Sequence, residues 1–199
     1  MRTALIALLA LATLLASATF ANAKGLTSGA EKLLMPDELM PQEGQPAPVR
    51  VNVDTNKGSF VLEIYPGIAP LSAASFLRLV NAGYYDGIVV HRVVDGFVMQ
   101  AGQPNDKQKD KEKLDIAFKD EVNYVHHGPG TISFAKLYDT DTKTYVPDSA
   151  GAQFFINLGD NKRLDENFTV FGKVVWGMDT VAKIKMGDVI NRAYTITGF

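Results

Sequence analysis

The alternation of apolar and polar residues along the chain predicts a fold built mainly from β-strands. Apolar residues stand at every second position in residues 49–53 and again in 60–64, with Asn-Lys-Gly between the two runs. Such alternation on both sides of a turn sequence predicts a β-hairpin. Residues 88–94 and 97–100 flank Asp95-Gly96, so a second hairpin is predicted there. Further strand-like segments follow in GTISFA, AQFFINL, FTVFGKVV and NRAYTITGF.

Two segments have the spacing of a helix. The first begins near Pro70 and ends before Gly83, with Leu71, Ala74 and Phe76 among its regularly spaced apolar residues. The second lies in GMDTVAKIKMG and ends at a glycine. Many strands with two isolated helices do not fit a series of βαβ units. They predict an antiparallel sheet closed into a barrel, with the helices at its ends.

Two polar segments connect these elements. Residues 106–121, DKQKDKEKLDIAFKDE, mix charges of both signs and are interpreted as a solvated loop with a short edge strand. Residues 137–151, LYDTDTKTYVPDSAG, are interpreted as a long polar loop. Because long loops on a rigid sheet often line functional sites, the second segment is a candidate for one wall of a site.

The chain begins with the pattern of a secretory signal peptide. Residues 1–23 contain one arginine, an apolar run from 4 to 16, and Ala-Asn-Ala at their end. The run is shorter than the roughly 20 residues of a transmembrane helix. The small residues of Ala-Asn-Ala favour cleavage there, with an uncleaved anchor as the alternative. Residues 24–48 hold four of the nine prolines and are interpreted as a flexible leader. Residues 49–199 then form one domain, exported, we expect, to a bacterial periplasm.

Composition agrees with a single exported globular domain and excludes some partners. The 199 residues are 46% hydrophobic and 21% charged, enough for a sizeable core. Without cysteine there is no disulfide, so the core alone must hold the exported domain. The formal net charge of −2 shows no basic excess, so nucleic acid and anionic lipid are not expected as partners.

The sequence offers little support for nucleophilic, metal or phosphate chemistry. There is no cysteine and no G-x-S-x-G motif, so a catalytic triad is not expected. His126 and His127 are adjacent and would point to opposite faces of a strand, without the spacing of a metal site. Gly128-Pro129-Gly130 lacks the lysine and helix of a phosphate loop and predicts a turn. No metal and no cofactor are expected.

Arg92 is the unusual residue, because it stands inside an apolar run. On an extended strand it would share a face with Val90 and Val94. Across the turn, the amide oxygen of Gln100 could hold its guanidinium group beside an apolar platform that includes Phe97. The alternative is a partly exposed strand residue whose aliphatic stem covers apolar surface. For Phe97 and its neighbour at position 99, an ordinary place in the core is the competing interpretation.

Four blocks carry a family resemblance: VHRVVDGFVMQAG, GTISFA, SAGAQFFINL and LDENFTVFGKVVWGMDTVAKI, in this order. Together they resemble the cyclophilin family of peptidyl-prolyl cis-trans isomerases, over roughly residues 48–199. The resemblance implies a mainly β fold, a closed eight-stranded antiparallel barrel capped by two α-helices, whose packed interior leaves the substrate outside. It also implies acceleration of X-Pro bond rotation in exported proteins, which would assist their folding.

The resemblance assigns roles to individual residues. Arg92, Phe97 and Gln100 match the catalytic group, with Gln100 positioning the arginine. His91 is expected to have a structural, hydrogen-bonding role. The positions that match substrate-binding residues are Val98, Ala135, Lys136, Gln153, Phe155, Arg163, Leu164 and Phe168.

Several positions depart from the family pattern. Val90 replaces the usual phenylalanine, and Ala101 and Gln103 alter the usual QGGD. Arg163 stands where animal members carry a drug-contacting tryptophan, and Phe168 where they carry histidine. We therefore expect isomerase activity to survive but cyclosporin binding to be weak.

The expected partners are proline-containing peptides and unfolded exported proteins, bound by a monomer. One alternative is a non-catalytic proline-peptide binding module or chaperone that uses the same groove, favoured by the positive charges of Lys136 and Arg163. Another is a structural subunit that docks through the short apolar cluster at residues 33–35 of the leader.

Overall fold

The computed structural model of the protein describes residues 44–197 except residue 124. The expected signal peptide, residues 1–23, and the leader as far as residue 43 lie outside the described residues. Within the described range, none of the helices has the length and apolar character needed to cross a bilayer.

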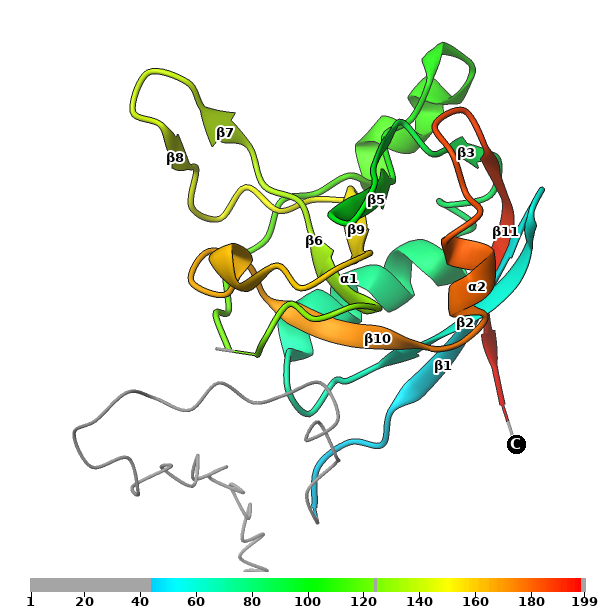
Figure 1. Cartoon of the computed structure of the whole chain (residues 1–199), viewed down its shortest axis with the longest axis horizontal. Helices are drawn as coiled ribbons and strands as arrows, with labels where there is room; N and C mark the ends of the chain where they lie inside the picture. Colours follow the sequence, from blue (N-terminus) through cyan, green and yellow to red (C-terminus); the bar gives the residue numbers. More distant parts are fainter. Residues whose placement is uncertain (1–43, 124, 198–199) are drawn as a thin grey trace, which may run out of the picture. The chain divides into compact units, whose positions relative to one another are not determined.

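One antiparallel sheet of nine strands dominates the described part of the chain (Figure 1). Its strand order is β3-β11-β1-β2-β10-β6-β9-β5-β4, while β7 and β8 pair with each other in a separate hairpin. The strands are β1 (Val49–Thr55), β2 (Gly58–Ile64), β3 (Ile88–Val89), β4 (Arg92–Val94), β5 (Val98–Ala101), β6 (Thr131–Phe134), β7 (Tyr138–Asp139), β8 (Thr144–Tyr145), β9 (Phe154–Asn157), β10 (Val170–Trp176) and β11 (Val189–Ile196). The helices are α1 (Pro70–Asn81) and α2 (Met178–Val181), with 3-10 helices η2 (Asp106–Leu114) and η3 (Lys162–Leu164).

The mainly β fold with two α-helices is confirmed, but the sheet does not close strictly into an eight-stranded barrel. The segment predicted as one strand, residues 88–94, is divided at Val90 and His91 into β3 and β4. β3 pairs with β11 and β4 pairs with β5. The strands at the two edges of the sheet, β3 and β4, therefore follow one another in the chain. A single strand there would join β11 to β5 and complete a ring of eight. The interruption explains both the ninth strand and the opening.

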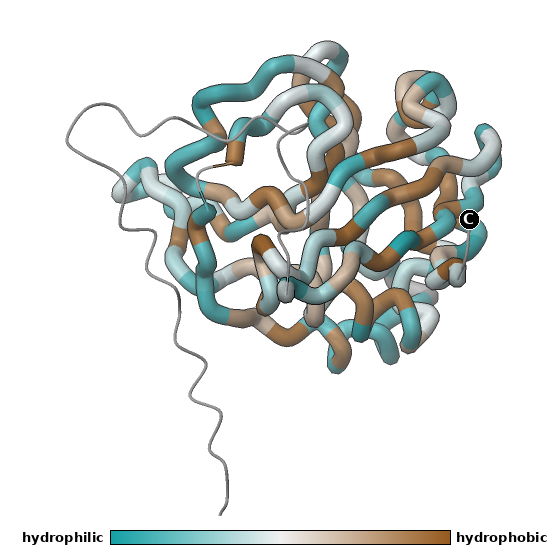
Figure 2. Tube along the Cα trace, turned by 90° about the horizontal axis from the view of Figure 1, so that it is seen from below, coloured by the Kyte–Doolittle hydropathy of each residue, from teal (hydrophilic) through white to brown (hydrophobic). Residues whose placement is uncertain are grey.

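The interior of the curled sheet is filled by aromatic side chains. Phe76 of α1 lies between 5.2 and 6.2 Å, measured between ring centroids, from rings on β6, β9 and β10 and from Tyr85. In Figure 2, hydrophobic segments (brown) run through the middle of the molecule, whereas much of its periphery is hydrophilic (teal). A close-packed interior leaves no room for a ligand, so a binding site must lie on the outer surface.

Helix α1 begins at the predicted proline, but only part of the expected apolar face is buried. Its buried residues are Ser72, Ala73, Phe76, Leu79 and Val80. Leu71 is 46% exposed and Ala74 is also exposed, so these two residues do not belong to the packed face. The start of the helix is capped by the Glu121 carboxylate, which accepts from the backbone N–H groups of residues 71 and 72.

The charged segment 106–121 is not the loop with an edge strand that its composition suggested. It begins with η2, and the Lys111 ammonium group donates to the carbonyl oxygens of Gly83, Tyr84 and Asp86 at 3.2, 2.8 and 2.6 Å. These three contacts anchor the segment to the loop that follows α1. Its strand character is limited to one bridge between Phe118 and Ala150.

Candidate active site

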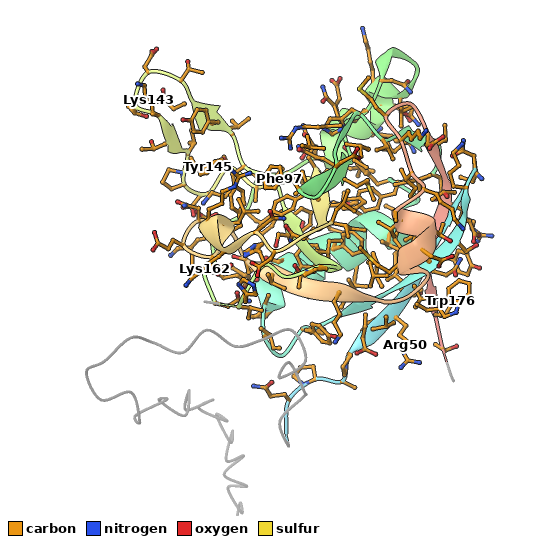
Figure 3. All side chains as sticks on the ribbon, viewed as in Figure 1. Arg50, Phe97, Lys143, Tyr145, Lys162 and Trp176 are labelled. Atoms are coloured by element: carbon orange, nitrogen blue, oxygen red, sulfur yellow. The ribbon has the colours of Figure 1, made fainter. Side chains whose placement is uncertain are left out.

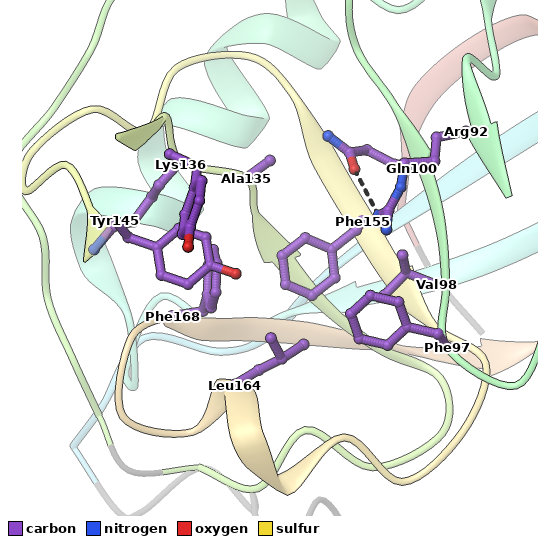
Figure 4. Close-up of a pocket in the computed structure, with 11 residues that line it drawn as sticks. Arg92, Phe97, Val98, Gln100, Ala135, Lys136, Tyr145, Phe155, Leu164 and Phe168 are labelled. Carbon is purple, nitrogen blue, oxygen red and sulfur yellow. Dashed lines mark hydrogen bonds between the residues drawn. The ribbon is translucent and has the colours of Figure 1, made fainter. Parts of the chain in front are cut away.

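An open pocket of about 400 Å³ lies on the outer side of the β4–β5 hairpin (Figure 4). Its lining comes from segments far apart in the sequence. These residues are Arg92, Phe97, Val98, Gln100, Ala135, Lys136, Tyr138, Tyr145, Phe155, Leu164 and Phe168. Of the residues that the sequence placed in the site, all but Gln153 and Arg163 line this pocket.

Strand alternation explains why the pocket and the interior receive neighbouring residues. On β9, Phe154 belongs to the interior cluster, whereas Phe155 belongs to a separate apolar cluster under the pocket. On β5, Met99 is fully buried in the interior, whereas Val98 joins the pocket cluster. Successive side chains on a strand point to opposite faces, so one sheet supplies both surfaces. Met99 is thus the ordinary core residue, and Phe97 is not.

The floor of the pocket is apolar and closely packed. Phe155 and Phe168 meet edge to face, with ring centroids 5.3 Å apart. Leu164, on η3, and Val98 complete a cluster in which every member is at most 5% exposed. Such a surface suits a small apolar ring such as that of proline.

Phe97 is fixed by its backbone at the mouth of the pocket. Its carbonyl oxygen accepts from the backbone N–H of Leu158 at 2.8 Å and from the Asn161 side-chain amide at 2.8 Å. The preceding Gly96 adopts φ of 67°, a left-handed conformation that glycine tolerates without strain. The predicted hairpin is therefore confirmed, but its turn contains three residues rather than two, and Phe97 is the last of them.

Arg92 stands at the edge of the pocket, held by a chain of two glutamines. Arg92 and Gln100 are register partners on β4 and β5, and the guanidinium Nη1 donates to Gln100 Oε1 at 3.3 Å. Gln100 Nε2 in turn donates to Gln153 Oε1 at 3.2 Å. The guanidinium carbon lies 5.4 Å from the centre of the Phe97 ring. Since a guanidinium carries five N–H donors, most of them remain available to a ligand.

The expectation that Val90 and Arg92 share a strand face is wrong. Val90 is buried in the interior, whereas Arg92 is exposed. The chain between β3 and β4 is bound to another segment, because Val90 donates to Asp188 and accepts from Gly187 through its backbone. The charge in this apolar run is therefore not buried, and the interpretation of Arg92 as an exposed strand residue agrees with its place beside the pocket.

The hydrogen-bonding role expected of His91 is not seen at its Nδ1 atom. Among the described residues, this atom is buried without a hydrogen-bond partner. Burial, and to a smaller extent the charge of Arg92, lowers the pKa of His91.

Gln153 and Arg163 lie beside the pocket rather than in its lining. Gln153 lines an adjoining hollow of about 250 Å³, which also contacts Gln100, Ala135 and Lys136. The guanidinium carbon of Arg163 lies 4.2 Å from the centre of the Phe97 ring, within cation–π distance. Phe97 therefore contacts both Arg163 and Arg92.

Lys136 contributes its stem more than its charge. Its ammonium group donates to Asp120 at 2.7 Å and to the Asn167 carbonyl at 3.0 Å. Its side chain is only 8% exposed. The charge of Lys136 is thus neutralised inside the protein, which weakens one of the two observations that favoured the chaperone alternative.

Sequence reasoning missed Tyr138 and Tyr145 as pocket residues. They are register partners on β7 and β8, with ring centroids 5.3 Å apart. Tyr145 also meets Phe168 edge to face at 4.6 Å. The feature of the sequence that could have indicated them is a long loop on a rigid sheet, with an aromatic residue on either side of its turn.

A buried hydrogen-bond network supports the floor of the pocket from below. Asp165 Oδ1 accepts from the backbone N–H and the Nδ1 of His127, both at 2.8 Å, and Oδ2 accepts from His126 Nδ1 at 3.0 Å. His127 Nε2 then lies 3.0 Å from the Ser133 hydroxyl. The His127 ring stacks against Phe155 at 6.2 Å and meets Phe168 at 6.4 Å.

This network corrects the expectation that the two adjacent histidines point in opposite directions. Neither residue lies in the sheet, and both side chains contact the same carboxylate. Ser133, His127 and Asp165 have the connectivity of a catalytic triad, but Ser133 and His127 are completely buried. A serine that no substrate can reach is not a nucleophile, so the arrangement is structural.

Burial and hydrogen bonding shift the pKa values in this network. Burial lowers the pKa of His127 despite the opposing influence of Asp165. For Asp165, burial by itself acts to raise the pKa, but the hydrogen bonds from His126 and His127 together outweigh it and lower the pKa. A neutral His127 beside an ionised Asp165 fits the observed contacts. Among the described residues, no three acidic, histidine or cysteine side chains are grouped as a metal site would require.

Comparison with known proteins identifies the family. The sequence matches the family described as cyclophilin type peptidyl-prolyl cis-trans isomerase/CLD over residues 50–197. A peptidyl-prolyl cis-trans isomerase of Acinetobacter baylyi is 37% identical over 139 residues, which cover 67% of this chain and 70% of that protein. One of Arabidopsis thaliana is 33% identical over 141 residues, covering 69% and 81%.

Solved structures agree with the fold. A crystal structure of a Cryptosporidium parvum cyclophilin-type isomerase is similar with a TM-score of 0.64 and 22% identity, covering 76% of this chain and 99% of that one. A second structure of that protein, determined in the presence of the dipeptide Ala-Pro, has a TM-score of 0.62 and 23% identity, covering 75% and 99%. The chain thus belongs to the cyclophilin-type peptidyl-prolyl cis-trans isomerases. Its activity is the cis-trans isomerisation of peptidyl-prolyl bonds.

Proposed function

We propose that the 400 Å³ pocket holds the proline of a substrate while Arg92 acts on the bond that precedes it. The observation that supports this most directly is the placement of an exposed, glutamine-held guanidinium beside a closely packed apolar floor. Proline-containing peptides are the ligands with both an apolar ring and an isomerisable amide, so their chemistry matches both parts.

The reaction sets a clear requirement on the site. The X-Pro amide is planar through resonance, and its rotation barrier is about 18–20 kcal/mol, so uncatalysed isomerisation takes tens to hundreds of seconds. No bond breaks during rotation. At the twisted geometry resonance is lost, and the prolyl nitrogen regains a lone pair that can accept a hydrogen bond.

Arg92 can meet this requirement because its contact forms only on the way to the twisted state. A planar amide nitrogen is a poor acceptor, whereas the twisted nitrogen is a good one. Interactions that are stronger in the transition state than in the ground state are the ones that raise the rate. Gln100 and Gln153 act as positioning residues, since they fix the guanidinium before substrate arrives.

Arg92 supplies only part of the rate acceleration, so the rest of the pocket must also contribute. A hydrogen bond to a charged group contributes about 1.5–3 kcal/mol, or about tenfold to about 150-fold in rate. Because Arg92 is exposed in the free protein, the upper part of this range requires substrate to cover it. Phe97, Phe155 and Leu164 would hold the proline ring while the preceding carbonyl swings, which adds orientation.

The clients in this proposal are exported proteins. The signal-like residues 1–23 support export to a bacterial periplasm, where X-Pro isomerisation limits the folding of many chains. Ala135 and Lys136 would contact the backbone that precedes the proline, since they border the pocket on the side away from Phe97 (Figure 4). Gln153 would contribute to the same contact, because it lines the adjoining hollow together with them.

Replacement of Arg92 tests the proposal. Arg92→Ala is expected to lower kcat/KM in a protease-coupled proline-peptide assay by about tenfold to about 150-fold, with an unchanged circular dichroism spectrum. Arg192→Ala is the matched control, because Arg192 is exposed and stacks on Tyr194 of β11. Full activity in Arg92→Ala would refute the catalytic role. If an inactive variant still suppresses the aggregation of client proteins, this suppression is better explained by the alternative of a non-catalytic binding module.

A further inference from the structure

The hairpin that carries Tyr138 and Tyr145 is held in its conformation by hydrogen bonds at its turn and at its base. The carboxylate of Asp139 accepts from the backbone N–H groups of Asp141 and Thr142 at 2.8 and 3.1 Å, which closes the turn. At its base, the backbone N–H of Val146 donates to the Leu137 carbonyl at 2.9 Å. These bonds hold the hairpin upright beside the pocket, away from the main sheet (Figure 1).

The two tyrosines extend the apolar floor to the rim of the pocket. Their rings form a continuous series with the floor, from Tyr138 to Tyr145 at 5.3 Å, to Phe168 at 4.6 Å and to Phe155 at 5.3 Å. Tyr138 is 52% exposed although it ends this series. Tyr145 stands across the pocket from Phe97 (Figures 3 and 4). The exposed end of the series is therefore an unused aromatic surface next to the proline site.

The size and charge of the pocket indicate what this surface could hold. A volume of about 400 Å³ falls in the range of pockets that bind drug-sized molecules, which exceed a single pyrrolidine ring. The ammonium group of Lys136, which lies 5.9 Å from the centre of the Phe168 ring, is neutralised by Asp120. The space beside the proline site is thus lined by uncharged rings, which favour another ring or a large apolar side chain.

The position of the hairpin indicates which side of the substrate it would meet. Ala135 and Lys136, proposed above to contact the backbone before the proline, lead directly into Tyr138 along the chain. Both also line the pocket together with the tyrosines. A substrate residue on the amino-terminal side of the proline would therefore reach the tyrosine rings.

We propose that Tyr138 and Tyr145 are specificity-determining residues that favour substrates with an aromatic residue one or two positions before the proline. This inference rests on the proposed function of the pocket, and it adds the substrate class. Each aromatic pair formed between substrate and tyrosine is expected to favour such a peptide by about twofold to about tenfold.

A peptide series on the full-length protein tests the inference. Four proline peptides are compared: one with alanine at both preceding positions, one with phenylalanine directly before the proline, one with phenylalanine two positions before, and one with phenylalanine after it. Both kcat/KM and the dissociation constant are measured. We expect the wild-type protein to prefer at least one of the two peptides with preceding phenylalanine, and Tyr138→Ala and Tyr145→Leu to abolish that preference.

The ratio between peptides, not the absolute activity, is the readout. Tyr194→Ala is the control, because Tyr194 lies on β11 and outside the pocket lining. A wild-type protein without preference, or one that prefers only the peptide with phenylalanine after the proline, overturns the inference. So does a preference that persists in both variants, or a variant that weakens all peptides equally. A protein that isomerises no peptide overturns the proposed function instead, and the dissociation constants then still decide whether the tyrosines select aromatic residues.

Discussion

Replacing Asp165 with alanine tests whether the buried network holds the pocket floor in place. The substitution removes the acceptor for three hydrogen bonds, from His126 Nδ1, His127 Nδ1 and the His127 backbone N–H. It leaves these donors in a site where Asp165 is only 3% exposed. The His127 ring, which stacks on Phe155, would lose one of the two side-chain hydrogen bonds that fix its orientation.

The expected loss of stability follows from these contacts. Three hydrogen bonds at a net contribution of about 1–1.5 kcal/mol each give about 3–4.5 kcal/mol. Since domains of this kind have unfolding free energies of about 5–15 kcal/mol, the variant should fold but lose much of its stability.

Urea unfolding measures this prediction. For a slope near 2 kcal/mol/M, the midpoint should fall by about 2 M in Asp165→Ala. The urea midpoint should fall less in Asp165→Asn, because the amide oxygen can still accept a hydrogen bond from His127. Asp160→Ala is the control, since the Asp160 side chain is 74% exposed and pairs with the other ring nitrogen of His126, so a change of at most about 1 kcal/mol is expected. Equal, small losses in Asp165→Ala and Asp160→Ala would show that the network does not support the fold.

Two further predictions concern pH and the positioning of Arg92. The pKa of His127 is lowered in the folded state from its ordinary value of 6.5, so the unfolded chain binds more protons below that pH. The free energy of unfolding should therefore be highest above about pH 6.5 and fall as the pH drops below that value. It should fall a second time below the ordinary Asp pKa of 3.8, because the pKa of Asp165 is also lowered. Urea midpoints between pH 8 and pH 3 check this, and a midpoint independent of pH from 7 to 5 would contradict it. Gln153→Leu should reduce kcat more than it raises KM, because it releases Gln100 and so the guanidinium group, while an unchanged kcat would show that Gln100 holds Arg92 without help.

The local pattern of the sequence determined the strands and the division of their residues between two faces. Period-two alternation follows from the geometry of an extended chain, and it correctly predicted the first hairpin. The same rule separates Phe154 in the interior from Phe155 in the pocket. The register of the second hairpin was not determined in this way: a two-residue turn at Asp95-Gly96 would place Met99 opposite Arg92, whereas the observed three-residue turn places Gln100 there.

Contacts between distant segments were decided only by the tertiary structure. His127 and Asp165 are 38 residues apart, so no local pattern could indicate that both histidines share one carboxylate. The tyrosines reach the pocket because their hairpin packs on Phe168, which belongs to another part of the chain. The interruption at Val90 depends on backbone bonds to residues 187 and 188, which override the strand tendency of its own segment. Local sequence sets backbone preference and side-chain alternation, whereas packing of remote segments decides which surfaces meet and where charge remains exposed.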